Sequence, residues 1–448
     1  MAVRTRRPNR GLAALMAEAR WGNGQVARAV NRVGLESGLD LRYDESAVSH
    51  WLTGTMPRRQ VRPVLLEALS RRLGRPVGPH EAGFGNAPVA RPETDAVAGV
   101  MDLGQADMDP SRRSVLAAGM YSAALMVPDY SELSGRLEAS RTGRTTHIGA
   151  GEVTTVRTMT NRIADILDEL GGAHARPMAA AFLVNTVGPY LKASASGPVR
   201  TDMLAAASDL VYLTGWMAMY EKAHGLGQQY YVQALKLAAA ARDHVTYCRT
   251  LRGMALQASN LGYGSKALQL ADSAAEAAPA AGPRLRAFLT GQQAHGAAMV
   301  KDRKQAFNRL RETEAALSKA DSRRDAIGGY DESAYQFHSA HVLYELGDLR
   351  GSIRALQLSN RVRPVQERQG RVHANGLLAQ RELELGHVEA ACATWQLFLD
   401  DYAFVSSARG DDHFDTMRTS VRPYRRNRAV RELDERADTV ARQKALPV

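Results

Sequence analysis

Residues 44–54 read DESAVSHWLTG, a polar turn followed by a short helical pattern that ends at a glycine. Asp44 stands at the position of a helix N-cap, and Gly54 can adopt the left-handed backbone that ends a helix. Val48 and Trp51 are three residues apart, so both face one side of the helix and should contact a core. The side chains that then face outward are those of Glu45, Ser46, Ser49 and His50.

Further short helices are expected on both sides of this stretch. Apolar periodicity predicts one helix over Leu12–Ala19 and a second over Gln25–Val33, with Asn23 as the N-cap of the second. Another helix is expected over Pro63–Leu73. This order of short helices with tight connections is typical of a helix-turn-helix module, so we expect residues 1–75 to form one.

Positive charge is concentrated in the same segment. The chain of 448 residues has a formal net charge of +11, and residues 1–75 contain 14 arginines against six acidic residues, a net +8 that leaves +3 for the other 373. A compact basic module is typical of a polyanion binder, since each cation near a phosphate releases condensed counterions. The alternative that charge alone leaves open is a solvated basic face.

The stretch from Asp44 to Gly54 resembles the recognition helix of the Cro/repressor (XRE) family, with its Ser-x-Trp-x-x-Gly ending. The resemblance implies that the outward side chains enter the major groove of double-stranded DNA. Two features depart from the family: the long connection over Gly34–Tyr43, and the acidic Glu45 where Gln is frequent, although a carboxylate can accept a hydrogen bond from cytosine. The residues expected to contact DNA are Asn23, Arg42, Glu45, Ser46, Ser49, His50, Arg58, Arg59 and Arg62.

Residues 76–127 are expected to join this module to the rest of the chain and to couple the two parts. The portion up to Pro110 is rich in Gly, Pro and Ala, which predicts a flexible linker. Ser111–Val127 begins with an arginine pair followed by an apolar run, and so imitates a twin-arginine export signal. Export signals lie at the N-terminus, so we expect instead a short apolar helix that docks on the C-terminal domain.

From about Gly151 onward the chain is a succession of paired helical patterns without convincing strands. A small residue in an apolar setting recurs with spacings of 33, 39, 49 and 35 residues, at Ala234, Ala267, Ala306, Ala355 and Ala390. These values scatter around the 34-residue tetratricopeptide period. We therefore expect an all-α protein in which a tetratricopeptide-like α-solenoid of roughly five helix pairs occupies residues 128–448.

One copy of the repeat is clearer than the others. Ala267, Ala274 and Pro279 have the offsets of the small, small and proline positions in a tetratricopeptide second helix. Leu-Gly pairs beginning at 261, 346 and 385 should form the turns between paired helices. The basic tail from Arg418 to Arg428 is expected to cap the solenoid or to touch DNA.

A solenoid of this kind has a concave inner wall that binds peptides or protein segments. Polar and aromatic residues on the first helices of the pairs are candidates for that wall, although each one alone is more often an ordinary surface residue. These candidates are Tyr220, Asn260, Gln293, His338 and Asn375.

Over nearly its whole length the chain is similar to a group of actinobacterial regulators that combine an XRE-type helix-turn-helix with a tetratricopeptide-like region. The match rests on the region of Trp51 and on Leu69–Gly74, Gly171–Arg176, Leu213–Trp216 and His224–Leu235. The resemblance implies a regulator of differentiation or secondary metabolism.

Motifs for catalysis, metal binding or a cofactor fail on spacing. Gly262–Lys266 lacks the Walker A pattern, His338 and His341 lack a completing ligand, and Asp411–Asp415 is read as a polar turn. We expect no enzymatic activity and no cofactor. Two cysteines exclude a disulfide framework and favour a reducing compartment. With no secretory signal and no apolar run of the ~20 residues that a spanning helix needs, a cytoplasmic protein without membrane contact is expected.

Two functions remain open at this point. The first is a transcriptional regulator that binds DNA as a homodimer, because one short recognition helix reads only a few base pairs, and whose solenoid senses a peptide or protein. The second is a tetratricopeptide-like adaptor that binds a protein partner and whose N-terminal module does not bind DNA.

Overall fold

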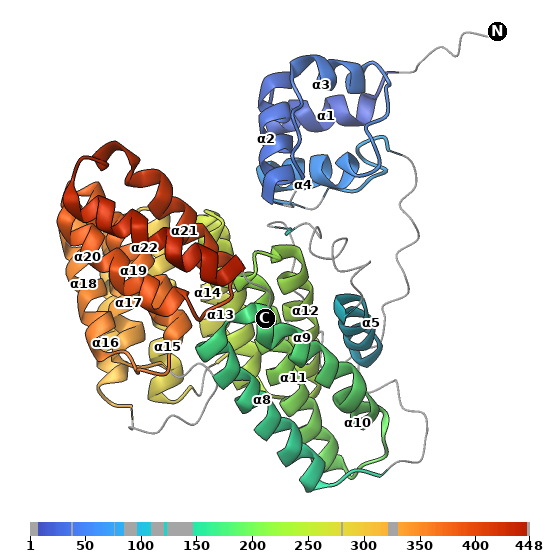
Figure 1. The fold of residues 1–448 in the computed structure, drawn as a ribbon. Coiled ribbons are helices and arrows are strands. Elements are labelled where there is room, and N and C mark those ends of the chain that lie inside the picture. The colour runs from blue at the N-terminus through green and yellow to red at the C-terminus, as the bar shows by residue number, and fades with distance from the viewer. Residues whose placement is uncertain are drawn as a thin grey trace.

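The computed structural model describes residues 8–36, 39–75, 77–84, 96–108, 121–122, 147–278, 281–320 and 330–445. Within these ranges the protein is all-α, and the only β-type pairing is one isolated bridge between His147 and Ser194. Figure 1 shows a small N-terminal module set beside a larger curved body of helices. The predicted all-α class is therefore confirmed.

The N-terminal module consists of α1 (Arg10–Ala19), α2 (Asn23–Glu36), α3 (Glu45–Leu52) and α4 (Val61–Leu73). Their apolar faces form one core in which Leu15, Val30, Val48, Trp51 and Leu65 are buried. Each end has a local cause: the Asn9 side chain caps α1, the Asp44 side chain caps α3, and positive φ angles at Gly54 and Gly74 follow α3 and α4. All four predicted helices are present, with ends that differ by a few residues.

The core of the module continues past residue 75, where the sequence had suggested its end. Val77, Ala82 and Phe84 are buried against the four helices. The Asn9 side chain donates to the Ala82 carbonyl at 2.9 Å, and the Val77 amide donates to Ser70 Oγ at 2.9 Å. Residues 77–84 are thus part of the module.

A helix lies between residue 76 and Pro110, where the sequence predicts a flexible linker. Helix α5 (Ala96–Met108) buries Val100 and Leu103 against the large body. Asp107 forms a buried ion pair with Arg176 and accepts a hydrogen bond from Tyr230 Oη at 3.1 Å. That part of the prediction is wrong, because the Ala- and Gly-rich stretch has an apolar face that the body covers. The helix expected over 111–127 lies outside the described residues except for Tyr121 and Ser122, which are not helical.

The large body is a run of helix pairs packed in sequence. It begins with α8 (Ala150–Leu170), α9 (Gly172–Phe182), the π-turn η2 (Leu183–Val187) and α10 (Gly188–Lys192). Six pairs follow: α11 (Gly197–Tyr220) with α12 (His224–Ala240), α13 (His244–Asn260) with α14 (Gly264–Glu276), α15 (Pro283–Met299) with α16 (Arg303–Leu317), α17 (Glu332–Glu345) with α18 (Leu349–Val362), α19 (Arg368–Glu384) with α20 (Val388–Tyr402), and α21 (Ala408–Ser420) with α22 (Arg428–Ala445). The short helix η3 (Arg422–Tyr424) lies between the last two. This arrangement is a helical-repeat domain.

The repeat has a different register from the one that the alanine spacing suggested. A small buried residue occupies the fourth position of five second helices, at Gly227, Ala267, Ala306, Ser352 and Ala391. These positions are 40, 39, 46 and 39 residues apart, so the units are longer than 34 residues. Ala234 and Ala355 are buried but lie further along their helices, and Ala390 is exposed. Only Ala267 and Ala306 were correctly aligned.

The turns within several pairs follow the predicted Leu-Gly pattern. Gly262, Gly347 and Gly386 have φ angles of +80°, +85° and +81°, in the region that favours glycine. Lys222 and Lys301 occupy the corresponding turns after α11 and α15, with φ angles of 60° and 66°. These turns therefore share a positive φ angle, but the residue that adopts it is glycine in three of them and lysine in two.

First helices of successive pairs approach one another through glycines. A Cβ on Gly291 of α15 would lie 2.4 Å from His338 Nδ1 of α17, and a Cβ on Gly376 of α19 would lie 2.5 Å from His413 Cγ of α21. The helix pairs form a curved series. Its late part contacts its early part, because the Ser406 amide, between α20 and α21, donates to the carbonyl of Leu170 at the end of α8 at 2.8 Å.

No helix in the described ranges is both long and apolar enough to cross a membrane.

The glycine contact gives a stability prediction. Gly291→Ala should lower the free energy of unfolding by about 1–3 kcal/mol, because the new methyl group would overlap His338 and Tyr330 in a packed interior. Gly151→Ala in α8 is the control, since a Cβ there meets nothing within 4 Å and alanine favours the helix. Urea unfolding monitored by circular dichroism measures both. Equal stability of the two variants would contradict the close approach.

Candidate functional site

Helix α3 is held firmly in the N-terminal module. Asp44 Oδ1 accepts a hydrogen bond from the Ala47 amide at 2.9 Å, and the ring of Trp51 meets that of Tyr43 edge-on at 5.1 Å. The Asn31 side chain of α2 donates to the Tyr43 carbonyl at 2.8 Å and accepts from the Tyr43 amide at 2.9 Å. The connection before α3 is thus fixed to α2. Sequence reasoning missed Asn31 and Tyr43, because no local pattern links residues twelve apart.

The outward row of α3 is as the sequence predicted. Ser46, Ser49 and His50 are exposed, while Val48 and Trp51 are buried beneath them. Glu45 is exposed too, but its carboxylate lies over Gly24, where a Cβ would be 2.3 Å from Oε1. This places the negative charge near the N-terminus of α2, which the helix dipole favours. Three polar side chains are therefore free to face a partner, and Glu45 also serves the α2–α3 contact.

The cations near α3 differ in availability. The side chains of Arg58 and Arg59 are exposed and have no ion-pair or hydrogen-bond partner within the described part of the chain. Arg62 Nε donates to the Pro57 carbonyl at 2.9 Å, so it supports the loop before α4. Arg42 is 85% exposed and pairs with Asp40 at 3.0 Å. Arg58 and Arg59 are the cations best placed to contact a phosphate.

Asn23 does not cap α2. The helix begins at Asn23 itself, and the Gly22 amide donates to Gln25 Oε1 at 2.9 Å. The prediction of an Asn23 N-cap is therefore wrong. The residue that directly precedes the helix is Gly22, and the Gln25 side chain accepts from its amide from within the first turn. Asn23 is half-buried as the first residue of the helix.

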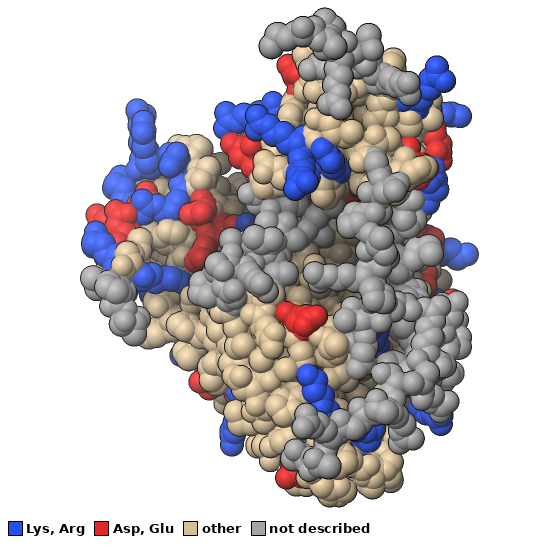
Figure 2. All heavy atoms as spheres, turned by 90° about the vertical axis from the view of Figure 1, so that its right-hand side faces the viewer, with Lys and Arg blue, Asp and Glu red and all other residues tan. Residues whose placement is uncertain are grey.

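Part of the basic charge of the module is used internally. Arg71 pairs with Glu36 and Glu67, each at 2.7 Å, and Arg75 pairs with Glu18 at 2.8 Å and Glu81 at 2.7 Å. Arg72 Nε donates to the Ala19 carbonyl at 2.9 Å. Figure 2 shows Lys and Arg side chains on the module at the top and a largely uncharged face on the body below it. The cationic surface is therefore smaller than the net charge of +8 suggested.

The Asp44 cap gives a test of how α3 is held. Asp44→Ala should lower the free energy of unfolding by about 1 kcal/mol, because the Ala47 amide in the first turn loses its acceptor. Asp40→Ala removes the same charge from the same loop and should change stability by less than about 0.5 kcal/mol, since its pair with Arg42 is exposed. Thermal unfolding of both variants provides the comparison. A loss in the Asp40 variant as large as that in the Asp44 variant would argue against the cap.

The five residues expected in the solenoid groove all lie on first helices, but they do not meet in one cavity. Tyr220 lies under the Arg409 guanidinium at 4.3 Å, and Asn260 is exposed with its side chain 3.8 Å from Met219 Sδ. Gln293 donates to Asp272 at 2.7 Å. His338 and Asn375 are buried and bonded to Tyr330 Oη at 2.9 Å and to Asn360 Nδ2 at 2.6 Å respectively.

First helices of successive pairs instead contact one another through aromatic and basic side chains. The rings of His295 and His341 are 4.8 Å apart, and His373 Nδ1 lies 2.9 Å from His413 Nε2. Burial lowers the pKa of His295 and of His413 to about 4, so both are neutral near pH 7. Arg252 lies 4.2 Å over the Phe288 ring, and burial lowers its pKa as well. Ring and cation–π contacts therefore connect the first helices of successive pairs.

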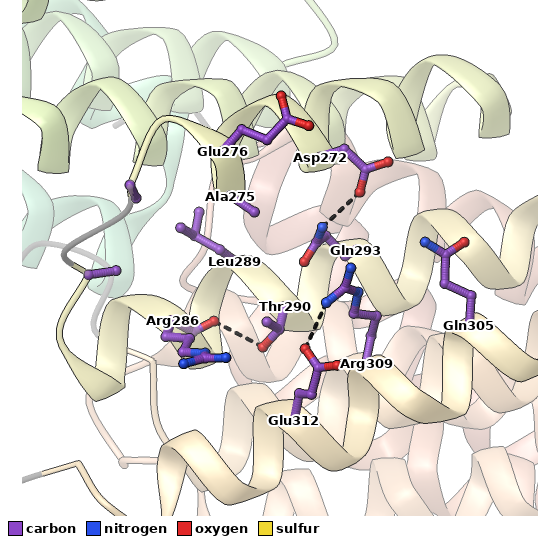
Figure 3. A pocket seen from close by; sticks show the side chains of 12 residues that line it. Asp272, Ala275, Glu276, Arg286, Leu289, Thr290, Gln293, Gln305, Arg309 and Glu312 are labelled. Carbon is purple, nitrogen blue, oxygen red and sulfur yellow. Dashed lines mark hydrogen bonds and ion pairs between the residues drawn. The ribbon is translucent and has the colours of Figure 1, made fainter.

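A polar pocket of about 580 Å³ lies between α14, α15 and α16. Figure 3 shows Asp272 and Gln293 pointing toward each other across it, with the Arg309–Glu312 ion pair at 2.7 Å beside them. Leu289 and small residues supply a limited apolar surface. The other charged and polar side chains that line it are Glu276, Arg286, Thr290 and Gln305. Charges of both signs suit a polar ligand or a peptide segment. Of the predicted groove residues, Gln293 lines this pocket.

The described ranges contain no group of three or more His, Cys, Asp or Glu side chains placed to hold a metal ion. Cys248 and Cys392 are both buried, and neither forms a disulfide. The Asp411–Asp415 stretch belongs to helix α21, so the prediction that it forms a polar turn is wrong.

Comparison with known proteins concerns the N-terminal module. Residues 12–85 match the family model of the SP15 N-terminal domain. The match begins inside α1 and ends one residue after Phe84, so the SP15 domain coincides with the core seen in the structure. No curated protein matches the chain, and no solved structure does. The chain is thus an SP15 domain followed by a helical-repeat region.

Proposed function

We propose that the protein is a cytoplasmic, non-enzymatic transcriptional regulator that binds double-stranded DNA through α3. The observation that carries the proposal is the exposed row of Ser46, Ser49 and His50 on a helix anchored by Trp51. A helix of this size fits the major groove, where hydroxyl and imidazole groups can bond base edges. Arg58 and Arg59 follow α3 directly and supply phosphate contacts that fix its register.

The helical-repeat domain is the proposed sensor of a peptide or protein partner. The pocket between α14, α15 and α16 supports this part, because its volume and mixed charge suit a polar segment. We extend the proposal to a role in differentiation or secondary metabolism, because the sequence resembles XRE-type regulators with tetratricopeptide-like regions. The alternative is an adaptor that uses the repeat domain alone.

Residues that read bases and residues that contact phosphates should reduce DNA affinity in different ways when they are replaced by alanine. Ser46→Ala, Ser49→Ala and His50→Ala should each weaken binding to selected DNA by about 1–3 kcal/mol for a genuine base contact, and should relax sequence preference. Arg58→Ala and Arg59→Ala should weaken binding to all sequences alike and reduce the salt slope by about one. Fluorescence anisotropy at several salt concentrations measures both effects.

Arg350→Ala is the matched control, since Arg350 is an exposed arginine of α18, outside the module. Equal losses on selected and random DNA from the α3 variants would contradict the base-reading role. Absence of DNA binding by the wild-type chain would favour the adaptor.

A homodimer is the assembly that we propose on DNA. One helix of eight residues reads only a few base pairs, so specificity needs two modules on half-sites about one helical turn apart. Light scattering of the complex should give two chains of 48.7 kDa per selected DNA duplex. One chain per duplex at saturating protein would contradict it.

A further inference from the structure

The N-terminal module docks on the repeat domain through a partly buried cluster. Arg71 of α4 donates to Glu36 at 2.7 Å and to the Tyr121 carbonyl at 2.9 Å, and its guanidinium lies 4.4 Å over the ring of Tyr263. Tyr263 Oη donates to the two carboxylate oxygens of Glu36 at 2.8 and 2.9 Å. A charged pair of the module is thus completed by a tyrosine of the repeat domain.

The chain between the two domains is part of the same contact. The ring of Tyr121 stacks on that of Tyr263 at 6.0 Å, with an angle of 14° between the planes. Ser122 is held by Gln228 of α12, which accepts from the Ser122 amide at 2.8 Å and donates to its carbonyl at 2.7 Å. Tyr121 is therefore fixed on the repeat domain while its carbonyl serves Arg71. The segment that was expected to couple the two parts is not their sole connection, because Tyr263 contacts the module directly.

Tyr263 occupies a position with a different role in other pairs. It directly precedes α14, as Asp302 precedes α16 and Asp348 precedes α18. Both aspartates cap their helices through their side chains, whereas α14 has no side-chain cap, as is also true of α12 and α20. The Tyr263 side chain is therefore not used by its own helix, and its hydroxyl bonds the module instead.

The contact leaves the proposed DNA-reading face open. Glu36 ends α2, and Glu45 of α3 lies over Gly24 near the opposite end of that helix. Figure 1 shows α3 on the side of the module away from the body. The helix that Tyr263 precedes, α14, also carries Asp272 and Glu276 of the pocket. One helix therefore connects the pocket with the docked module.

We propose that the Arg71–Glu36–Tyr263 contact is a latch that holds the module in its DNA-binding orientation, and that the repeat domain regulates DNA affinity by keeping or releasing it. This inference rests on the proposed function. A docked module presents α3 in one orientation, whereas a released module must lose orientational freedom when it binds. A ligand acts on such a device only through different affinities for the two arrangements.

The test uses the full chain with Tyr263→Asp. This variant can cap α14 as Asp302 and Asp348 cap their helices, so the repeat domain should stay folded, but it removes the ring and faces Glu36 with a second negative charge. His387→Asp is the matched control, because exposed His387 directly precedes α20 in the same kind of turn. Small-angle X-ray scattering reports docking, and anisotropy reports affinity for DNA selected with the wild-type chain.

Tyr263→Asp should increase the radius of gyration and weaken binding to the selected DNA at least tenfold, while His387→Asp should match the wild type in both measurements. A variant that is undocked but binds within twofold of the wild type, or more tightly, would overturn the latch and leave the proposed function standing. A variant that remains docked would overturn it as well. Failure of the wild-type chain to select any DNA sequence would overturn the proposed function, and with it the latch.

Discussion

Close approach between helices, permitted where a side chain is small or missing, is the constraint on which the large body depends. Gly227, Ala267, Ala306, Ser352 and Ala391 occupy one position in five second helices and let each pair pack closely. Gly291 and Gly376 admit the histidines of neighbouring first helices. The pairs therefore curve tightly enough for the Ser406 amide to bond the Leu170 carbonyl. A polar pocket of the domain lies between α14, α15 and α16.

Arginines have two separate tasks in the N-terminal module. The side chains of Arg71, Arg72 and Arg75 bond groups of the protein itself, whereas those of Arg58 and Arg59 have no partner among the described residues. Buried ion pairs gain little net stability, because desolvation offsets the attraction. The Arg71–Glu36 pair is therefore better explained by orientation than by stability, since Tyr263 completes its hydrogen bonds. Arg71 thus helps to position the module, while Arg58 and Arg59 remain available to a polyanion.

Sequence reasoning succeeded where local chemistry decides the structure. The Asp44 cap, the buried Val48 and Trp51, and the glycine turns at 262, 347 and 386 are all set by near neighbours. It failed where distant residues decide. The apolar face of α5 is covered by the body. The register of the repeats depends on where each helix begins. Tyr263 contacts a module that lies more than two hundred residues earlier in the chain. The predicted groove residues lie on the expected helices, but the curvature that separates them cannot be read from spacing.

Amide hydrogen exchange of the full chain with and without selected DNA tests the central claim most directly, because it locates the contact without any substitution. The account predicts added protection over α3 and the turn that carries Arg58 and Arg59, and unchanged exchange over α15 to α20. Protection confined to the repeat domain, with α3 exchanging as fast as in the free protein, would contradict it.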